Sequence, residues 1–406
     1  MRASYLKKTY VYITTVIILL LLYQVLKTVT YTNQIHREGN KLTVNRTVLI
    51  GEVNQTVKEE NKSDLKYILQ WTMPGNVPFV YMGKGQEGFI DRKCPYTNCF
   101  VTADRSYLGD YTKFDVIAFA GPEVIKLYDL PKMRSPHQKY VFATIESSEN
   151  YPTCSNRFDG FFNWTWTFKL NSEVQWGYFA IRDKNNTKIG PKKQMHWIKL
   201  DDMDPVSEDF KNQLKTKTEA VAWFVSNCFT RSRREKYVND LKRELSKYKM
   251  DVDVYGRCGT LRCSRDDEEA CDAILEEKYY FYLSFENSFS EDYVTEKLLH
   301  GLENNVVPIV YGGANYTQYM PDGIYLNARQ LNVEELATKI NELINDPDKY
   351  SEYFRWKNHY SYHRLFKSVD TDPYCLFCTT LNNKEMVKKT TIYKDFRKWW
   401  DPPGQC

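Results

Sequence analysis

The sequence predicts an α/β protein with two domains that face a ligand cleft, each built on a parallel sheet. Short apolar runs alternate with polar, helix-like stretches, and this strand–helix–strand alternation is typical of parallel sheets flanked by helices. The alternation comes in two sets, separated by a polar, charge-rich run at 206–218 that we expect to be a linker. A length of 406 residues also exceeds the usual size of one domain.

The first set predicts an N-terminal α/β domain over residues 65–205. Its apolar runs are short and end in turn or loop signals, as buried strands do. These runs are YILQW at 67–71, DVIAFAG at 115–121 and KYVFATIE at 139–146. Glu146 ends the third run, so its carboxylate is expected at a strand end, where it either caps a loop or faces the cleft.

The second set predicts a C-terminal α/β domain over residues 219–365. The expected strands are 220–227, 252–256, 279–287 and 306–313, and the expected helices are 234–248 and 295–305. In α/β sheets ligands bind beyond the carboxyl ends of the strands. The polar residues that follow these strands are therefore the candidates for a binding site.

The segment ENSFSEDYVTEK at 286–297 is the most informative candidate. Asn287 in the segment and Tyr282 just before it flank the end of one strand. Tyr293, Glu296 and Lys297 lie at the start of the next helix. Acid, amide, phenol and ammonium groups together suit a sugar nucleotide, which offers hydroxyls and a charged diphosphate. Glu296 can accept two hydroxyls and Lys297 can neutralise a phosphate. The alternative is a Glu–Lys pair on a solvated helix surface.

A second candidate follows the strand AVAWFVSN. Ser226 and Asn227 end this strand, and the basic pair Arg233–Arg234 opens the next helix. A helix N-terminus attracts phosphate, and arginine adds bidentate hydrogen bonds. The alternative is a solvated basic face that includes Arg231.

The N-terminus predicts a single-pass membrane anchor. A short basic tail (1–8) precedes an uncharged apolar stretch (9–26), which is near the minimum length for a membrane-spanning helix. No small-residue cleavage site follows, so a retained signal-anchor is expected in place of a cleaved signal peptide. The positive charges precede the span, which predicts a cytoplasmic N-terminus, with a polar stem (27–64) and both domains on the other side.

Acceptor sequences for N-glycans agree with a lumenal address. They begin at Asn45, Asn54, Asn61, Asn163, Asn185 and Asn315. The chain also has 10 cysteines, several of them closely spaced, which indicates disulfides in an oxidising compartment.

Metal and nucleic-acid sites are not expected. Cys375 and Cys378 form a C-x-x-C motif, but no second such motif or histidine cluster accompanies it. Asp251 and Asp253 match the D-x-D pattern of metal-dependent glycosyltransferases, yet they alternate with valines in a strand pattern, which predicts that both aspartates face solvent. The formal charge of +4 is small for this length and does not indicate nucleic-acid binding.

The chain resembles the α-1,3-fucosyltransferase family from about residue 65 to the C-terminus. The resemblance is strongest in FYLSFENSFSEDYVTEK, then in AVAWFVSN with its arginines, and then in VFATIESSENYP and FNWTWTF; VYGGANY is somewhat similar to the branch that modifies the N-glycan core. It implies type II Golgi membrane enzymes with a GT-B fold of two Rossmann-like domains. It also implies an inverting reaction that uses GDP-fucose and requires no cofactor.

The same resemblance assigns roles to residues. Arg234 (with Arg233 as the alternative) and Lys297 would bind the diphosphate, and the other donor contacts would be Ser226, Asn227, Tyr282, Asn287, Tyr293 and Glu296. Glu146 would be the catalytic base, although Ser148 replaces a frequent proline and Glu149 is a second acid nearby. Cys94 and Cys99 would pair with Cys375 and Cys378, which ties the first domain to a C-terminal segment, 366–406.

The expected function is fucose transfer in α-1,3 linkage to N-acetylglucosamine of glycoprotein glycans in the Golgi lumen. The expected partners are GDP-fucose, the glycan acceptor and the membrane. Two alternatives stay open: a glycosyltransferase with another nucleotide sugar, and a membrane-anchored carbohydrate-binding protein without turnover. The sequence does not choose between core and antennal acceptors.

Overall fold

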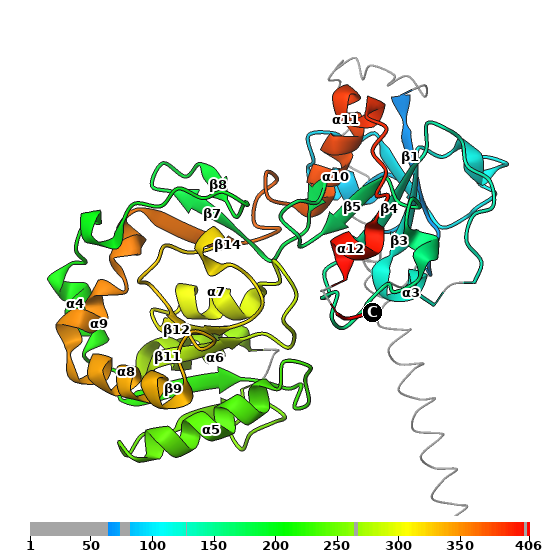
Figure 1. Ribbon diagram of the computed structural model, residues 1–406. Coiled ribbons are helices and arrows are strands. Elements are labelled where there is room, and N and C mark those ends of the chain that lie inside the picture. The colour runs from blue at the N-terminus through cyan, green and yellow to red at the C-terminus, as the bar shows by residue number, and fades with distance from the viewer. Residues whose placement is uncertain (1–63, 74–81, 127, 264–266, 402–403) are drawn as a thin grey trace, which may run out of the picture. The chain divides into compact units, whose positions relative to one another are not determined.

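The structure is a computed structural model that describes residues 64–73, 82–126, 128–263, 267–401 and 404–406 (Figure 1). All of these residues belong to one compact unit, Lys62–Cys406. The predicted tail, membrane anchor and nearly all of the stem lie outside the described residues, as do Asn45, Asn54 and Asn61. Among the helices that are described, none has the length and apolar character needed to cross a membrane.

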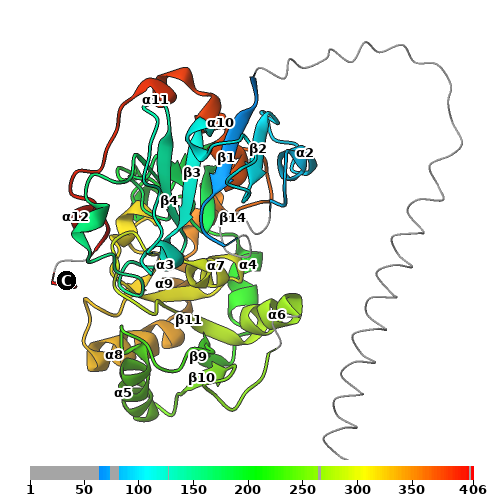
Figure 2. The same cartoon turned by 90° about the vertical axis from the view of Figure 1, so that its right-hand side faces the viewer.

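The first sheet has six parallel strands in the order β2-β1-β3-β4-β5-β6. The strands are β1 (Lys66–Gln70), β2 (Cys99–Thr102), β3 (Val116–Ala120), β4 (Lys139–Thr144), β5 (Trp164–Thr167) and β6 (Val174–Gln175). Every residue of β3 and β4 is buried, which explains why these strands are continuous apolar runs. Figure 2 shows β1 to β4 side by side. We call this sheet and its surrounding elements the first lobe.

Two short helices belong to the first lobe, α2 (Glu87–Asp91) and α3 (Gly121–Val124). The helix α3 begins directly at the end of β3 and lies close to β4. A Cβ atom on Gly121 would stand only 2.7 Å from the ring of Phe142. Glycine is therefore needed where α3 meets the sheet.

The second sheet has five parallel strands in the order β10-β9-β11-β12-β13. The strands are β9 (Glu219–Phe224), β10 (Val252–Tyr255), β11 (Tyr279–Phe285), β12 (Val307–Tyr311) and β13 (Leu326–Asn327). The helices are α5 (Arg234–Ser246), α6 (Glu268–Lys278), α7 (Glu296–Glu303), α8 (Val333–Asn345) and α9 (Pro347–Glu352). We call these elements the second lobe.

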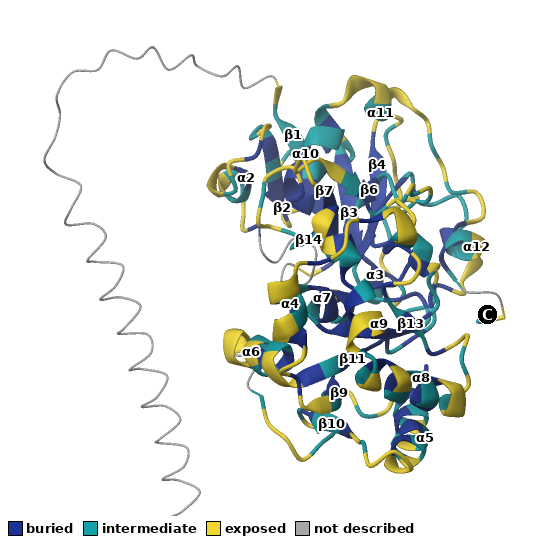
Figure 3. Ribbon diagram, turned by 90° about the vertical axis from the view of Figure 1, so that its left-hand side faces the viewer, coloured by how far each residue is buried: buried dark blue, intermediate teal, exposed yellow. Residues whose placement is uncertain are grey.

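The helix starts of the second lobe are fixed by polar side chains. The Thr295 hydroxyl accepts a hydrogen bond from a main-chain N–H at the start of α7, and Asp267 does the same for α6. Asn332 and Glu335 form a reciprocal capping box at the start of α8. The helices α6 and α8 bury one face against the sheet and expose the other, as the colours of Figure 3 show.

A third, antiparallel sheet joins segments that are distant in sequence. Its order is β14-β7-β8, with β7 (Phe179–Asp183), β8 (Lys188–Gly190) and β14 (Tyr360–Arg364). Residues of β7, β14 and α7 share one apolar core cluster, which includes Ile181, Tyr362 and Leu298. The helix α7 is therefore held by the third sheet as well as by the second.

The C-terminal segment returns to the first lobe. It contains α10 (Pro373–Asn382), α11 (Lys384–Lys388) and α12 (Phe396–Trp400), which are orange to red in Figure 1. Tyr374 and Phe377 of α10 join one core cluster of the first sheet, and Phe396 and Trp400 of α12 join another. The last residues of the chain thus complete the core of the first lobe.

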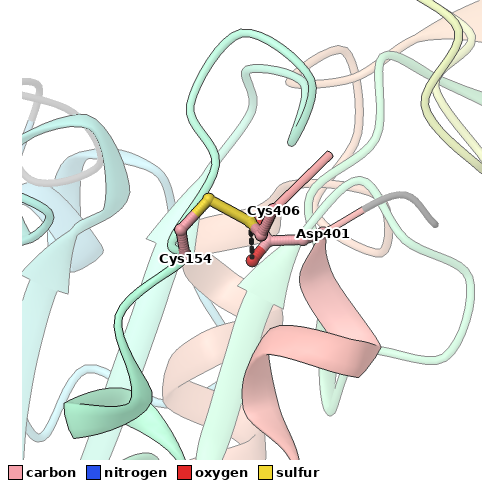
Figure 4. A group of neighbouring side chains, drawn as sticks. All are labelled: Cys154, Asp401 and Cys406. Carbon is pink, nitrogen blue, oxygen red and sulfur yellow. Dashed lines mark hydrogen bonds between the residues drawn. A yellow bond between two sulfur atoms is a disulfide. The ribbon is translucent and has the colours of Figure 1, made fainter. Parts of the chain in front are cut away.

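Five disulfides pair all 10 cysteines. Cys94 is bonded to Cys375 and Cys99 to Cys378, the pairing that the family resemblance implied. The other three bonds, which the sequence did not reveal, are Cys154–Cys406, Cys228–Cys258 and Cys263–Cys271. In Figure 4 the Cys154–Cys406 bond lies beside Asp401, whose carboxylate accepts hydrogen bonds from the N–H and hydroxyl of Thr153.

The predicted strands and helices of both sheets are present, with ends that differ by a few residues. The predicted linker at 206–218 is not wholly irregular, because it contains the helix α4 (Glu208–Leu214). Ser207 caps α4 by accepting a hydrogen bond from the Phe210 N–H, and Leu214 is buried. The helix was missed because few of its side chains pack against the core. The third sheet was also not predicted.

The two neighbouring disulfides to α10 should not contribute additively to stability. They close loops of 281 and 279 residues, which are almost the same loop. Replacing all four of their cysteines by alanine should lower the free energy of unfolding by about 5 kcal/mol, whereas replacing one pair should lower it by much less. Guanidinium unfolding without reductant measures the free energy of unfolding of both variants. Equal losses for one pair and for both pairs would contradict this expectation.

Candidate active site

A cavity of 590 Å³ lies at the carboxyl ends of β9 and β11, where α5 and α7 begin. It is lined by all nine residues that the sequence analysis singled out: Glu146, Ser226, Asn227, Arg234, Tyr282, Asn287, Tyr293, Glu296 and Lys297. A larger hollow of 710 Å³ beside α8 contains none of them. The structure therefore gathers the predicted residues of both lobes around one cavity.

Arg234 is the first residue of α5 and is 3% exposed. Its Nη1 donates a hydrogen bond to the Phe285 carbonyl (2.5 Å) and its Nη2 to the Asn227 carbonyl (3.3 Å). The buried Nε has no hydrogen-bond partner among the described residues. Arg233, the alternative, is exposed and precedes the helix in the left-handed conformation, with φ 51°. Arg234 is thus the arginine that faces the cavity.

Lys297 lies in the first turn of α7, and its side chain is 17% exposed. Its Nζ donates to the Thr295 hydroxyl (2.7 Å) and lies 2.9 Å from Glu296 Oε1 and 3.4 Å from Glu286 Oε2. Burial lowers the pKa of Lys297, but the two carboxylates outweigh it and raise the pKa above its ordinary value. The ammonium is therefore charged, and it points to the same cavity as Arg234. Two cations at two helix starts form an anion-binding region.

Glu296 is the most accessible acid of the site, with a side chain that is 56% exposed. Burial of part of the group raises its pKa, but the Lys297 ammonium outweighs this and holds the pKa of Glu296 below its ordinary value. The ionised carboxylate has oxygens available for hydroxyl groups of a ligand.

Glu146 enters the cavity from the first lobe, two residues after β4. Its N–H donates to the Thr144 hydroxyl (3.1 Å), and its Oε2 accepts a hydrogen bond from the Tyr293 hydroxyl (3.4 Å). Burial raises the pKa of Glu146, and the Lys297 charge and the Tyr293 hydrogen bond offset this only in part. A raised pKa makes a carboxylate a better proton acceptor near neutral pH.

Glu149, the alternative acid, is used to hold the two lobes together. Its Oε2 accepts a hydrogen bond from the Phe289 N–H (2.6 Å), and its own N–H donates to the Ser290 hydroxyl (3.0 Å). Ser148, at the position where the family often has proline, donates to the same Ser290 hydroxyl (3.1 Å). Because Glu149 does not line the cavity, the geometry favours Glu146 as the base.

Two buried tyrosines form one wall of the cavity. Tyr293 packs on Phe168, with ring centroids 5.0 Å apart, and Tyr282 lies within β11 instead of at its end. Burial raises the pKa of each phenol far above its ordinary value. Both therefore remain protonated and can donate hydrogen bonds.

The three remaining predicted residues lie at the rim. Ser226 and Asn227 follow β9, which ends at Phe224, and their carbonyls accept hydrogen bonds from Arg257 and Arg234. Asn287 follows β11, and its side-chain oxygen accepts a hydrogen bond from Asn150 of the first lobe (3.2 Å). These residues position the site arginine and link the lobes.

Several lining residues were not found from the sequence. They are Ile145, Tyr178, Phe224, Val225, Tyr255, Gly256, Cys263, Glu268, Cys271 and His300. The Tyr178 hydroxyl donates to the Ile145 carbonyl (2.6 Å), next to Glu146. Tyr178 lies just before β7, and no local pattern indicated that it would reach the end of β4. The aromatic residues Phe224 and Tyr255 read as ordinary strand residues.

Two clusters of potential metal ligands occur among the described residues, and both have other partners. In one, Cys154 and Cys406 form the disulfide beside Asp401. In the other, Glu268, Asp272 and His300 lie around Arg364, whose guanidinium pairs with Glu268 at 2.6 Å and with Asp272 at 3.6 Å. A site already occupied by a guanidinium does not fit a divalent cation.

The D-x-D pair does not line the cavity either. Asp251 is exposed and pairs with Lys242, as its strand pattern predicted. Asp253 is not fully solvent-facing, because its Oδ2 accepts a hydrogen bond from the buried Tyr279 hydroxyl (2.7 Å).

The described glycan acceptor sequences differ in accessibility. Asn185 and Asn315 are exposed. Asn163 is not a free acceptor: its Oδ1 accepts from the Tyr140 N–H (2.9 Å) and its Nδ2 donates to the Thr391 carbonyl (2.8 Å). The structure therefore disfavours Asn163 among the candidate acceptors, because its amide already links two parts of the first lobe.

Comparison with known proteins identifies the family of this chain. The model described as "Glycosyltransferase family 10 (fucosyltransferase) C-term" matches residues 214–399, and "Fucosyltransferase, N-terminal" matches residues 63–179. The chain is 38% identical over 315 residues to "Alpha-(1,3)-fucosyltransferase C" of Drosophila melanogaster, covering 76% of this chain and 70% of that protein. It is 30% identical over 374 residues to "Glycoprotein 3-alpha-L-fucosyltransferase A" of the same organism, covering 89% of this chain and 65% of that protein.

A solved structure, "Crystal Structure of alpha1,3-Fucosyltransferase with GDP-fucose", is also similar, with a TM-score of 0.47 and 17% identity over 82% of this chain and 92% of that chain. On the sequence matches, this chain belongs to the α-1,3-fucosyltransferase family and is an enzyme of that family. The resemblance inferred from the sequence motifs is thereby confirmed.

Peptide mapping of protein made in a eukaryotic secretory host should find no glycan on Asn163. Attachment there would displace an amide that is hydrogen-bonded on both sides. Asn185 and Asn315 serve as exposed comparison sites in the same digest. A folded, active preparation with Asn163 fully glycosylated would contradict this interpretation.

Proposed function

We propose that the protein transfers L-fucose from GDP-β-L-fucose, in α-1,3 linkage, to N-acetylglucosamine of glycoprotein glycans, with inversion at the anomeric carbon. One observation carries the proposal. Two largely buried cationic side chains of the second lobe, Arg234 and Lys297, line the same cavity as the Glu146 carboxylate of the first lobe. Family membership supports the donor and the linkage. The cavity supplies a place where the diphosphate and a base can flank one sugar.

The reaction is a single displacement. Glu146 takes the proton of the acceptor hydroxyl while the hydroxyl oxygen bonds to the anomeric carbon of fucose. The bond from that carbon to the diphosphate oxygen breaks, and its electron pair leaves with GDP. Arg234 and Lys297 stabilise the negative charge that grows on the leaving diphosphate. Attack from the face opposite the leaving group inverts the anomeric configuration.

The other lining residues hold the donor. Glu296 accepts hydroxyls of the fucose or ribose, and Tyr282 and Tyr293 donate hydrogen bonds from neutral phenols. Ser226, Asn227 and Asn287 contact the donor at the rim. We assign the two lobes to the GT-B arrangement, in which the second lobe binds the nucleotide sugar and the first lobe binds the acceptor.

No cofactor is included in this proposal, because the two side-chain cations supply the charge that a divalent ion supplies elsewhere. We also propose a Golgi membrane location, with an N-terminal anchor at 9–26 and the catalytic lobes in the lumen. The five disulfides support an oxidising compartment.

Glu146→Gln should reduce kcat for fucose transfer at least ~10²-fold, because the amide cannot accept the proton. Its affinity for GDP, measured by calorimetry, should be unchanged. Glu149→Gln is the matched control: glutamine can still accept the Phe289 N–H bond, so near-normal turnover is expected. Linkage analysis of the product from GDP-fucose and N-glycan acceptors tests the reaction itself. Transfer of another sugar, or binding without turnover, would overturn the proposed function.

Chelation should leave the activity intact. Wild-type protein dialysed against EDTA should retain its rate of fucose transfer, because Arg234 and Lys297 provide the charge at the leaving group. A large loss on dialysis that added Mn²⁺ or Mg²⁺ restores would show that the two side chains are insufficient.

A further inference from the structure

Glu286 is a buried acid that the proposed reaction does not use. It directly follows β11, is 1% exposed and does not line the cavity. Its Oε1 accepts hydrogen bonds from the Thr295 N–H (2.8 Å) and hydroxyl (3.0 Å), and its Oε2 lies 3.4 Å from Lys297 Nζ. A carboxylate so far from water is unfavourable unless it is paired and hydrogen-bonded.

The main chain at Glu286 is fixed from two sides. The Glu286 N–H donates to the Tyr311 carbonyl of β12 (2.9 Å), and the Glu286 carbonyl accepts from the Ser232 hydroxyl before α5 (2.8 Å). Arg234 donates to the carbonyl of the preceding residue, Phe285. The acid therefore stands between the starts of α5 and α7, the helices that carry both site cations.

We infer that Glu286 is a positioning residue, which holds the Lys297 ammonium charged and directed at the donor diphosphate from behind the cavity. The inference rests on the proposed function, since it names what fixes one of the two diphosphate-binding cations. Glu286 touches neither donor nor acceptor in this account. It acts only through Lys297.

The groups that face Lys297 come from four elements. They are Glu286 after β11, Glu296 and Thr295 at α7, Arg234 of α5, Glu146 after β4, and the phenols of Tyr282 within β11 and Tyr293 before α7. The phenols are neutral, and Arg234 disfavours a second positive charge. Of the carboxylates, Glu296 is 56% exposed and will itself bind ligand, whereas Glu286 is enclosed and permanently in place.

The charge of Lys297 then depends on Glu286. A lysine loses its charge as the pH rises through its pKa, so diphosphate binding through Lys297 is lost on the alkaline side. Removing the enclosed negative charge leaves Glu296 as the main group that opposes burial and Arg234, so the pKa of Lys297 falls. The alkaline limit of donor binding must then move to lower pH.

The experiment measures kcat/KM for GDP-fucose and the affinity for GDP across neutral and alkaline pH, with the full chain. Glu286→Gln keeps the shape and an acceptor for Thr295 but removes the charge, and should move the alkaline limb down by ~1–3 pH units. In the double variant E286Q/K297R the limb should not move, because a guanidinium stays charged at these pH values. Glu276→Gln is the matched control and should behave as wild type. Glu276 is a half-buried acid of α6, and its carboxylate accepts hydrogen bonds from the side chains of Asn305 and Gln213.

An E286Q limb that coincides with wild type overturns the inference, as does an equal shift in E276Q. If E286Q does not fold, the thermal melt of E286Q/K297M replaces the pH profile. Removing both charges should restore much of the lost stability, because a buried pair can be replaced by neutral groups; no recovery overturns the inference. Wild-type protein that binds no GDP at any pH refutes the proposed function, whereas normal GDP binding with an unshifted E286Q limb refutes only the role of Glu286.

Discussion

The enclosed ion pair between Glu286 and Lys297 requires the surrounding structure to provide hydrogen bonds for both charged groups. A carboxylate 1% exposed and an ammonium 17% exposed are stable only if they are paired and their remaining hydrogen bonds are made. Thr295 supplies two of these hydrogen bonds while it also caps α7. One threonine thus connects the local start of a helix with the electrostatics of the cavity.

The segment between Glu286 and Lys297 also makes contacts with the first lobe. Ser290 and the Phe289 N–H bind residues 148 and 149 of the first lobe. Asp292 is 2% exposed and pairs with Lys193 at 2.8 Å, while its Oδ2 accepts from the Leu170 N–H. The segment that carries Lys297 therefore also contacts the part of the first lobe that carries Glu146. This coupling explains how Tyr293 can reach Glu146 from the other lobe.

The charge states of the site residues follow from the partial burial of acidic and basic side chains that lie next to one another. Burial alone would discharge Lys297 and protonate the acids, but each acid is placed beside a cation. Glu296 remains ionised because Lys297 is adjacent, whereas Glu146 has weaker compensation and a raised pKa. Similar side chains thereby acquire different chemical properties: the pKa of Glu296 is lowered and that of Glu146 is raised.

The sequence by itself determined the two parallel sheets, the helix starts that carry Arg234 and Lys297, the strand end before Glu146, and the family. These are local properties, because an apolar run indicates a buried strand, and polar residues directly after a strand indicate a binding site at the carboxyl end of the sheet. It did not determine the choice of Arg234 over Arg233, the use of Glu149 as a contact between lobes, the engagement of the Asn163 amide, or the place of Tyr178. Each of these depends on a hydrogen bond or burial that joins residues far apart in the chain. Only the packed tertiary structure decides such contacts, since no local periodicity encodes which distant group a side chain will meet.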